Sequence, residues 1–358
     1  MVWLDSERNE YSRLVVPLAD KQLVLRLAIL AISSAHMQPD PEIQAGFSES
    51  ASQAAVSIIT ERVRRMAGSD TEDNRPCTTS DDGALEGVLA AMLILSNYSL
   101  VGARMSHAQS HRDAARILVH TLTLNRTPND ELFIFLKNQV AAYDILSCTT
   151  LFDFEHVEHA VLPSFERGDI VFGRFLNIVH QITTQSLQEV HLDTRSRSNL
   201  IMELEDQFEL ARGSTLLAAG PLISSYSSSS KQDFTRLIQV YHHAGVLYAC
   251  QRLCKHETSE AGKHHASRLF TVLERFENIN TFLHDLVWPV FIAGIWVDRD
   301  RERMRMVTNL CQRLSANTGF KYYNDMSNFL QELWRSLHQD WSLLAREWHR
   351  KGVPIIPV

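Results

Sequence analysis

Cysteine and histidine residues at helical spacing are the first candidates for chemistry in this chain. Cys250 and Cys254 are four residues apart, so a helix would place both on one face, with His243 seven residues before Cys250 on the same stripe and His256 just beyond. Zn²⁺ binds Cys and His in tetrahedral sets, so these four residues form one candidate metal site. A structural zinc site also needs a second ligand pair, and the sequence offers none. We therefore interpret the cysteines as small core residues, and we expect no metal.

Two histidine pairs have the spacing of ligands without the rest of a known motif. His107 and His111 are four residues apart, but the segment lacks the glutamate of a His-Glu-x-x-His zinc protease. His156 and His159 match neither that motif nor its inverse. Because the chain has 16 histidines, such pairs arise by chance. We assign neither pair a ligand role.

Nucleotide-binding and nucleophilic motifs are also missing from the sequence. The segment 261–264, Ala-Gly-Lys-His, lacks the upstream Gly and the Ser or Thr of a phosphate-binding loop, and no G-x-G-x-x-G occurs. No spacing selects a Ser, His and Asp set from the many available. The sequence therefore favours a protein that is not an enzyme and that carries no cofactor.

Composition indicates the fold class that would position these residues. The chain has 358 residues, of which 45% are hydrophobic, and only 14 are Gly and 10 are Pro. This composition, with frequent helical and rare alternating periodicity, predicts an all-α fold with a single large domain of roughly a dozen helices over 1–358. The net charge of −7 disfavours a free-standing nucleic-acid binder.

The number of cysteines and the hydropathy of the chain indicate the cellular compartment in which the protein works. Five widely spread cysteines form no disulfide framework, which fits a reducing environment. The N-terminus lacks the pattern of a secretory signal. The most apolar stretch, 87–103, is short for a membrane span and contains Asn97 and Tyr98. We expect it to be a buried helix, with no membrane association.

Helical periodicity divides the chain into thirteen segments. The predicted helices cover residues 20–37, 47–66, 84–101, 106–124, 130–150, 170–191, 196–219, 231–255, 266–280, 283–297, 300–316, 322–338 and 339–350. Asp20 is the expected N-cap of the first, with Leu23, Leu27 and Leu30 on one stripe. Polar, breaker-rich stretches near 68–83 and 224–230 are expected to be flexible loops.

An apolar run near the C-terminal end contains a proline and a glycine, two residues that are unfavourable within helices. Residues 286–297 are apolar and contain Trp288-Pro289 and Gly294, and a charged stretch, 298–303, follows directly. Proline fits best in a first helical turn, so Trp288-Pro289 predicts a helix start. A helical glycine costs about 1 kcal/mol relative to alanine, so Gly294 indicates a close backbone approach. The charged stretch predicts a capped, solvated start of the next helix.

Aromatic residues are concentrated in the last 71 residues of the chain. They include Trp288, Trp296, Trp334, Trp341 and Trp348. We expect these rings to form a large aromatic core. The alternative is a pocket or a partner groove among the C-terminal helices, because ligand sites are mostly apolar with a few polar groups.

The run from Trp288-Pro289 through Ala293-Gly294 to the charged helix start resembles the fungal-specific transcription factor domain. That domain follows the DNA-binding cluster in many fungal zinc-cluster regulators. Further motifs resemble the family in the same order along nearly the whole chain, although Ala108 and Ala114 replace a Trp and a Gly that the family usually carries. The motif residues, all interpreted as structural, are Pro17, His111, Tyr143, Trp288, Pro289, Gly294, Trp334 and Trp341.

The resemblance implies a non-enzymatic, nuclear regulator of transcription that works through protein contacts. Its implied partners are the transcription machinery or a related regulator, as a homo- or heterodimer, and an apolar small-molecule effector and a metabolic or secondary-metabolite gene set fit the same role. The six-cysteine cluster of such regulators has closely spaced Cys-x2-Cys pairs, and this chain has none. We therefore expect no direct DNA binding by this chain alone.

Two alternatives of other classes remain open from the sequence. One is a helical enzyme or ligand-binding protein with an apolar C-terminal pocket. The other is an interaction scaffold, or a decoy that dimerises with a full-length regulator.

Overall fold

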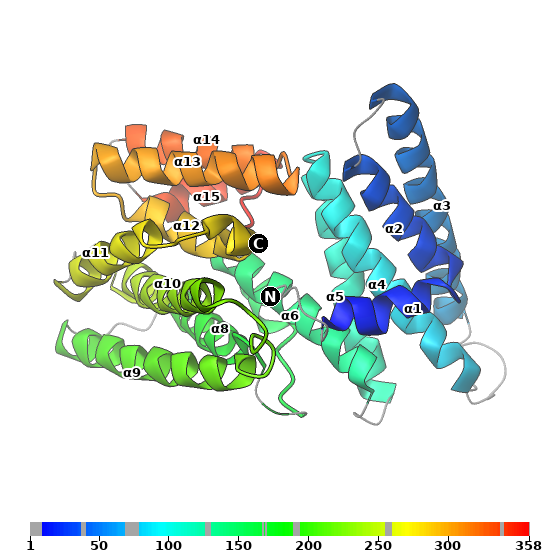
Figure 1. Ribbon diagram of the computed structural model, residues 1–358, viewed down its shortest axis with the longest axis horizontal. Helices are drawn as coiled ribbons and strands as arrows, with labels where there is room; N and C mark the ends of the chain where they lie inside the picture. The colour runs from blue at the N-terminus through cyan, green and yellow to red at the C-terminus, as the bar shows by residue number, and fades with distance from the viewer. Residues whose placement is uncertain are drawn as a thin grey trace. The chain divides into compact units, whose positions relative to one another are not determined.

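Helices are the only regular elements in the part of the chain that the structure describes. The computed structural model describes residues 9–36, 41–68, 79–125, 130–166, 168, 170–188, 194–254, 260–336 and 340–357. Within those residues, fifteen α-helices are joined by short turns, which confirms the predicted all-α fold (Figure 1). No helix in the described ranges has both the length and the apolarity needed to cross a membrane. The chain divides into two compact units, described separately below.

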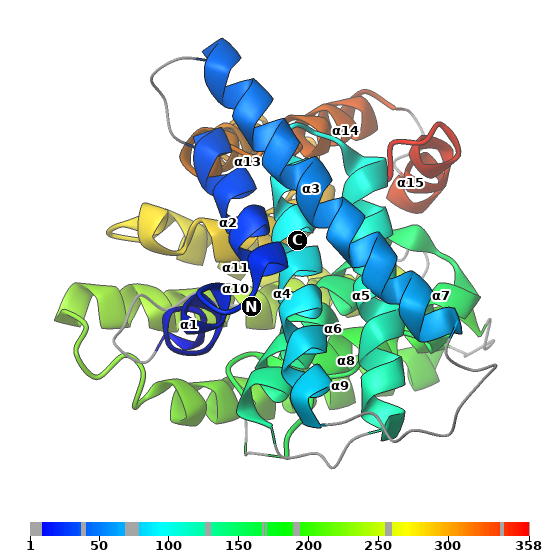
Figure 2. The same ribbon diagram turned by 90° about the vertical axis from the view of Figure 1, so that its right-hand side faces the viewer.

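The unit Glu7–Val140 is built around one almost completely buried helix. Its elements are a π-helical turn (Tyr11–Val15), α1 (Val16–Ala19), α2 (Leu23–His36), α3 (Pro41–Gly68), α4 (Thr79–Val101), α5 (Met105–Asn125) and the start of α6 (Glu131–Leu151). Residues 88–95 of α4 are all buried, as predicted for the apolar stretch 87–103. Figure 2 looks onto this unit, with α2 and α3 in front of α4.

The first predicted helix of this unit differs from the structure at its start. Asp20 is the C-cap of α1 and not an N-cap, because Pro17 opens a separate short helix and α2 begins only at Leu23. The predicted stripe is also wrong: Leu23 and Leu30 are 57% and 39% exposed. The buried face of α2 is instead lined by Val24, Leu25, Ala28 and Ala31.

The unit Ala141–Val358 surrounds a long central helix, α10 (Ser228–Leu253). Its other helices are α7 (Phe154–Glu158), α8 (Gly173–Leu187), α9 (Thr194–Ala219), α11 (Glu260–Glu274), α12 (Val287–Ile295), α13 (Arg301–Thr318), α14 (Tyr323–Arg335) and α15 (Trp341–Arg350), with 3₁₀ turns at Ile279–Phe282 and His284–Leu286. Helices α8, α9, α11 and α12 pack around α10, and α13 and α14 pack on α12 (Figure 1).

Both predicted loops, 68–83 and 224–230, end earlier in the structure than the sequence predicts. The second ends at Ser227, whose hydroxyl accepts a hydrogen bond from the Ser230 backbone N–H and caps α10, so the following serines are helical. Serine competes for backbone donors in this way and favours helix N-caps. The first loop lies largely outside the described residues, and α4 has already begun at Thr79.

Candidate functional site

The Trp-Pro tract forms α12, the most deeply buried helix of its unit. Pro289 is the third residue of α12, so the first helical turn accommodates its missing N–H, as predicted. Every residue from Val287 to Gly294 is buried. The tract is therefore a core element from which α13 and α14 are positioned.

Gly294 of α12 packs tightly against Leu330 of α14. A Cβ atom added at Gly294 would lie 2.6 Å and 2.8 Å from the two Cδ atoms of Leu330. The Gly294 carbonyl lies in the last turn of α12, where helical carbonyls lack intrahelical partners, and it accepts a 2.8 Å hydrogen bond from the Trp334 indole N–H. Two motif residues thus contact each other directly.

The remaining aromatic residues of this region pack against one another. Trp288, Phe291 and Phe329 are fully buried, and the rings of Phe291 and Trp341 meet edge to face with centroids 6.0 Å apart. Edge-to-face pairs of this kind contribute about 0.5–1.5 kcal/mol beyond their buried area. These rings therefore fill the core of the unit, as the sequence predicts.

The other three sequence-predicted motif residues belong to other helices. Pro17 is exposed in α1, His111 is half-buried in α5, and Tyr143 is half-buried in α6. Burial, with added positive charge from His107 and Arg104, lowers the pKa of His111 to about 4. A shift of this origin keeps the imidazole neutral near pH 7.

The connection from α12 to α13 is a tight turn made without glycine. Asp298 and Arg299 have φ angles of 47° and 60°, and the Asp300 N–H donates to the Val297 carbonyl over 2.9 Å. Two successive positive φ angles with this hydrogen bond are typical of a type I′ turn. Asp300 then caps α13, as its carboxylate accepts from the backbone N–H groups of Glu302 and Arg303 at 2.8 Å and 3.2 Å.

A cleft of about 650 Å³ lies between α11 and α13. Its floor is apolar and buried, and it includes Phe270, Leu273, Ile279 and Leu310. Its rim is charged, with the side chains of Glu274, Asp300, Glu302, Arg303, Arg305 and Arg313. A volume of 300–1,000 Å³ is typical of small-molecule sites. The cleft is thus our candidate functional site.

The three arginines of the rim differ in the contacts that their side chains make. The guanidinium carbon of Arg303 lies 4.8 Å from the centre of the Phe270 ring, and its Nε is 3.6 Å from Asp300. Arg313 donates a 2.6 Å hydrogen bond to the Asn280 side-chain oxygen. Arg305 is exposed on the same helix and lines the cleft. A ligand in the cleft would therefore meet both guanidinium and carboxylate groups at the rim.

Sequence spacing did not reveal this cleft. The sequence left open a pocket or groove among the C-terminal helices, and the cleft lies among them, between α11 and α13, although none of the five tryptophans lines it. The only sequence signal was the mixture of arginines and acids at 299–305, interpreted as a solvated helix start. Asp300 both caps α13 and lines the cleft, and Arg303, whose backbone N–H donates to that cap, lines the cleft as well.

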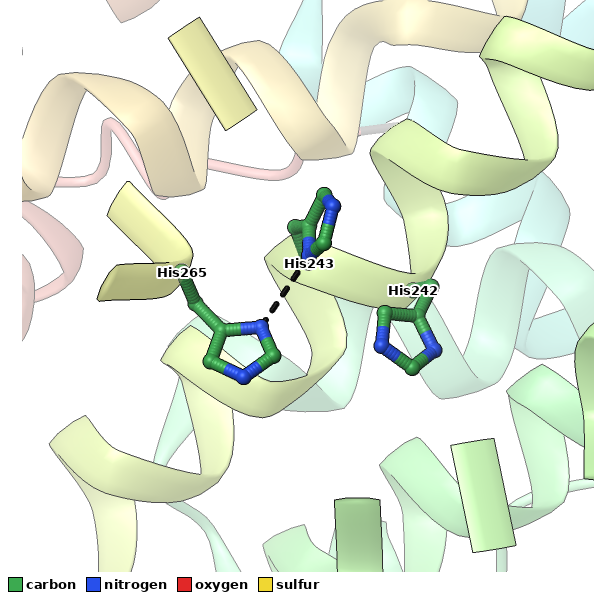
Figure 3. Close-up of side chains that lie close together, drawn as sticks. All are labelled: His242, His243 and His265. Carbon is green, nitrogen blue, oxygen red and sulfur yellow. Dashed lines mark hydrogen bonds between the residues drawn. The ribbon is translucent and has the colours of Figure 1, made fainter. Parts of the chain in front are cut away.

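The histidines and cysteines that sequence spacing grouped together are grouped differently in the structure. Cys250 and Cys254 are buried at the end of α10. His243 is grouped with His242 and His265 (Figure 3), while His256 lies outside the described residues. The pairs His107–His111 on α5 and His156–His159 around α7 belong to no three-residue ligand group among the described residues.

Comparison with known proteins assigns the chain to one family. A family model described as the fungal specific transcription factor domain matches residues 1–349, which confirms the predicted resemblance. Neither a search of curated proteins nor a search of solved structures returns a match.

Proposed function

Because this chain belongs to the family of fungal specific transcription factor domains, we propose that it is a regulatory domain whose output is set by a small molecule bound between α11 and α13. Membership in this family supports a role in transcription regulation. The proposed site of action is the nucleus, and the proposed role is non-enzymatic. Both units act as one regulatory domain in this proposal, because the family model spans both.

The cleft is the observation that carries the effector proposal. Its buried apolar lining residues favour a hydrophobic body. Three arginines, which share the rim with three carboxylates, are the groups that would bind a carboxylate of the ligand. The proposed effector is therefore an amphipathic organic acid, more polar than the apolar effector that the sequence suggested. The motif residues are proposed to act structurally, since Gly294 and Trp334 hold α12 against α14 and do not line the cleft.

Binding is tested with a matched pair of probes and a matched pair of variants. Thermal unfolding of the full chain is measured with 2-naphthoate and with neutral 2-naphthamide. We expect the acid alone to raise Tm, and Arg305→Gln to remove the shift. Arg301→Gln is the control, because Arg301 is exposed on the same helix but does not line the cleft. Equal shifts with acid and amide, or no shift with a wider acid series, would contradict the proposal.

Regulation is tested separately from binding. The chain is fused to a heterologous DNA-binding module in a fungal reporter strain, and reporter expression is measured with and without the cleft variant. We expect the fusion to change expression through contacts with the transcription machinery, and we expect Arg305→Gln to alter the response. A fusion that remains outside the nucleus and leaves the reporter unchanged would count against the regulatory role.

A second candidate function, dimerisation, is favoured by the outer face of α9. Met202, Leu210 and Leu217 are 62%, 71% and 82% exposed, and their spacing places them on one side of the helix. The three side chains lie about two turns apart along this face, and exposed apolar residues aligned on one face are a feature of protein contacts. Light scattering after size-exclusion chromatography should show a dimer that Leu210→Asp converts to monomer. A native monomer at all concentrations would remove this candidate.

A further inference from the structure

Three histidines from two neighbouring helices bring their ring nitrogens together inside the Ala141–Val358 unit. His242 and His243 are consecutive in α10, and His265 lies in α11, which packs on α10. One ligand atom from each histidine lies within 4.8 Å of those of the other two (Figure 3). We propose that these three residues, the histidine cluster, form a binding site for one Zn²⁺ ion.

The shortest contact in the cluster is already close to metal-ligand geometry. The Nδ1 atoms of His243 and His265 are 3.0 Å apart, and their rings point toward each other (Figure 3). With Zn–N bonds of about 2.0–2.1 Å, nitrogens at this separation would subtend an angle of about 95° at the metal. A tetrahedral angle requires them to separate to about 3.4 Å. Small side-chain rotations therefore suffice for these two ligands.

A carboxylate beside the cluster determines which nitrogen of His265 can bind. The Nε2 of His265 is 3.2 Å from Oε1 of Glu205 on α9. A carboxylate only accepts, so Nε2 carries the proton and Nδ1 keeps its lone pair. His243 then donates its Nδ1 proton to that lone pair. On metal binding, this proton moves to Nε2 of His243, so both Nδ1 atoms become ligands and no net proton is released. A carboxylate–histidine–metal arrangement of this kind raises ligand basicity and fixes the ring.

His242 supplies the third nitrogen and an independent reason for a ligand. Its side chain is 8% exposed, and its Nδ1 is buried without a hydrogen-bond partner within the described residues. A buried polar atom left unpaired costs free energy, which a metal bond or a proton donor would recover. The nearest carboxylate oxygen, Oε2 of Glu209, is 3.8 Å from that Nδ1. Glu209 or a water molecule is therefore the expected fourth ligand.

Charged side chains of both signs lie around the cluster. Neutral imidazole is the form that binds metals. Two carboxylates, Glu205 and Glu209, face the cluster, and Arg212 and Arg268 oppose them in part. A bound Zn²⁺ would join α10 to α11, with α9 contributing the outer carboxylates.

Metal binding is measured with Co²⁺ and Zn²⁺ on the full chain purified in chelator. We expect one equivalent of Co²⁺ to give the visible absorption of a tetrahedral site, and one equivalent of Zn²⁺ to abolish it. Glu205→Gln leaves all three histidines in place, so it should weaken affinity by about 10–100-fold, the effect typical of outer-shell carboxylates. His243→Asn should remove the spectrum, with circular dichroism confirming that the variant folds.

The control is His107→Asn. His107 has a second histidine, His111, four residues away on the same helix, but it belongs to no ligand group in the described residues. This variant should bind Co²⁺ as the native chain does. The proposal is overturned if the native chain gives no stoichiometric spectrum, or if His243→Asn and Glu205→Gln both bind as tightly as the native chain.

Discussion

Replacing Gly294 by alanine sets two opposing effects against each other at the contact between α12 and α14. Alanine is favoured over glycine in a helix interior by about 1 kcal/mol. The new methyl group, however, would lie 2.6–2.8 Å from the Cδ atoms of Leu330, about 1 Å closer than an ordinary carbon–carbon contact. Leu330 is fully buried, so its side chain cannot swing into solvent. Overpacking of this kind costs about 1–3 kcal/mol.

We therefore expect Gly294→Ala to be destabilising by up to about 2 kcal/mol, the difference between these two effects, with a fall in Tm of up to about 8 °C. Urea unfolding followed by far-UV circular dichroism measures the change. Gly213→Ala is the matched control: it is also a helical glycine, in α9, but a Cβ there meets no atom within 4 Å. Gly213→Ala should be neutral or stabilising by up to about 1 kcal/mol.

A double-mutant cycle isolates the contact itself. Leu330→Ala alone should cost about 2–5 kcal/mol, because it leaves a cavity in the core. In that background the methyl group of Gly294→Ala enters empty space, so the second substitution should no longer destabilise. If Gly294→Ala costs the same with and without Leu330, the close approach of the two helices is not its cause, and the reasoning fails.

Three further predictions concern the ends of α12 and α13. Trp334→Phe removes the donor to the Gly294 carbonyl and should cost about 1–3 kcal/mol in urea unfolding, since the acceptor stays buried; an unchanged midpoint would contradict this. Arg299→Gly places glycine at a positive φ angle and should be stabilising by about 1 kcal/mol, a gain absent from Arg299→Ala when Tm values are compared. Hydrogen bonds from the Arg303 and Glu302 N–H groups lower the pKa of Asp300, so its stabilising effect is complete above the unfolded-state pKa and is lost as pH falls through the folded-state value. Asp300→Asn should flatten that acidic part of the stability–pH curve, and an unchanged curve would show that the cap does not titrate.

Local chemistry explains why most helices and their ends could be predicted. A first-turn proline, an aspartate N-cap and helical periodicity act within a few residues, so the Trp288-Pro289 start of α12 and the capped start of α13 follow from sequence alone. The predicted N-cap at Asp20 was wrong, because a separate helix start lies just before it. Pro17 opens α1, and the next helix begins only after it has ended.

Which side of a helix is buried depends on its neighbours. Three of the leucines of α2 fall on one stripe of the helix, yet Leu23 is exposed and Val24 and Leu25 are buried. Helices α3 and α4 pack on α2, and Gly87 of α4 brings the backbone close to the Gln22 side chain. A helix with apolar residues on several sides has no single inward face until its partners are placed.

The sequence by itself determined the all-α class and the Trp-Pro helix start, and it indicated a close approach at Gly294, because periodicity, proline and glycine act through local backbone energetics. The family followed from the resemblance of motifs in the same order along the chain. Only the tertiary structure decided which side chains meet. His243 was paired by spacing with Cys250 and Cys254 on its own helix, whereas its contact is His265, 22 residues away on α11. The cleft likewise joins α11 to the start of α13. Such contacts depend on how helices are oriented against one another, and that orientation follows from the packing of the whole core.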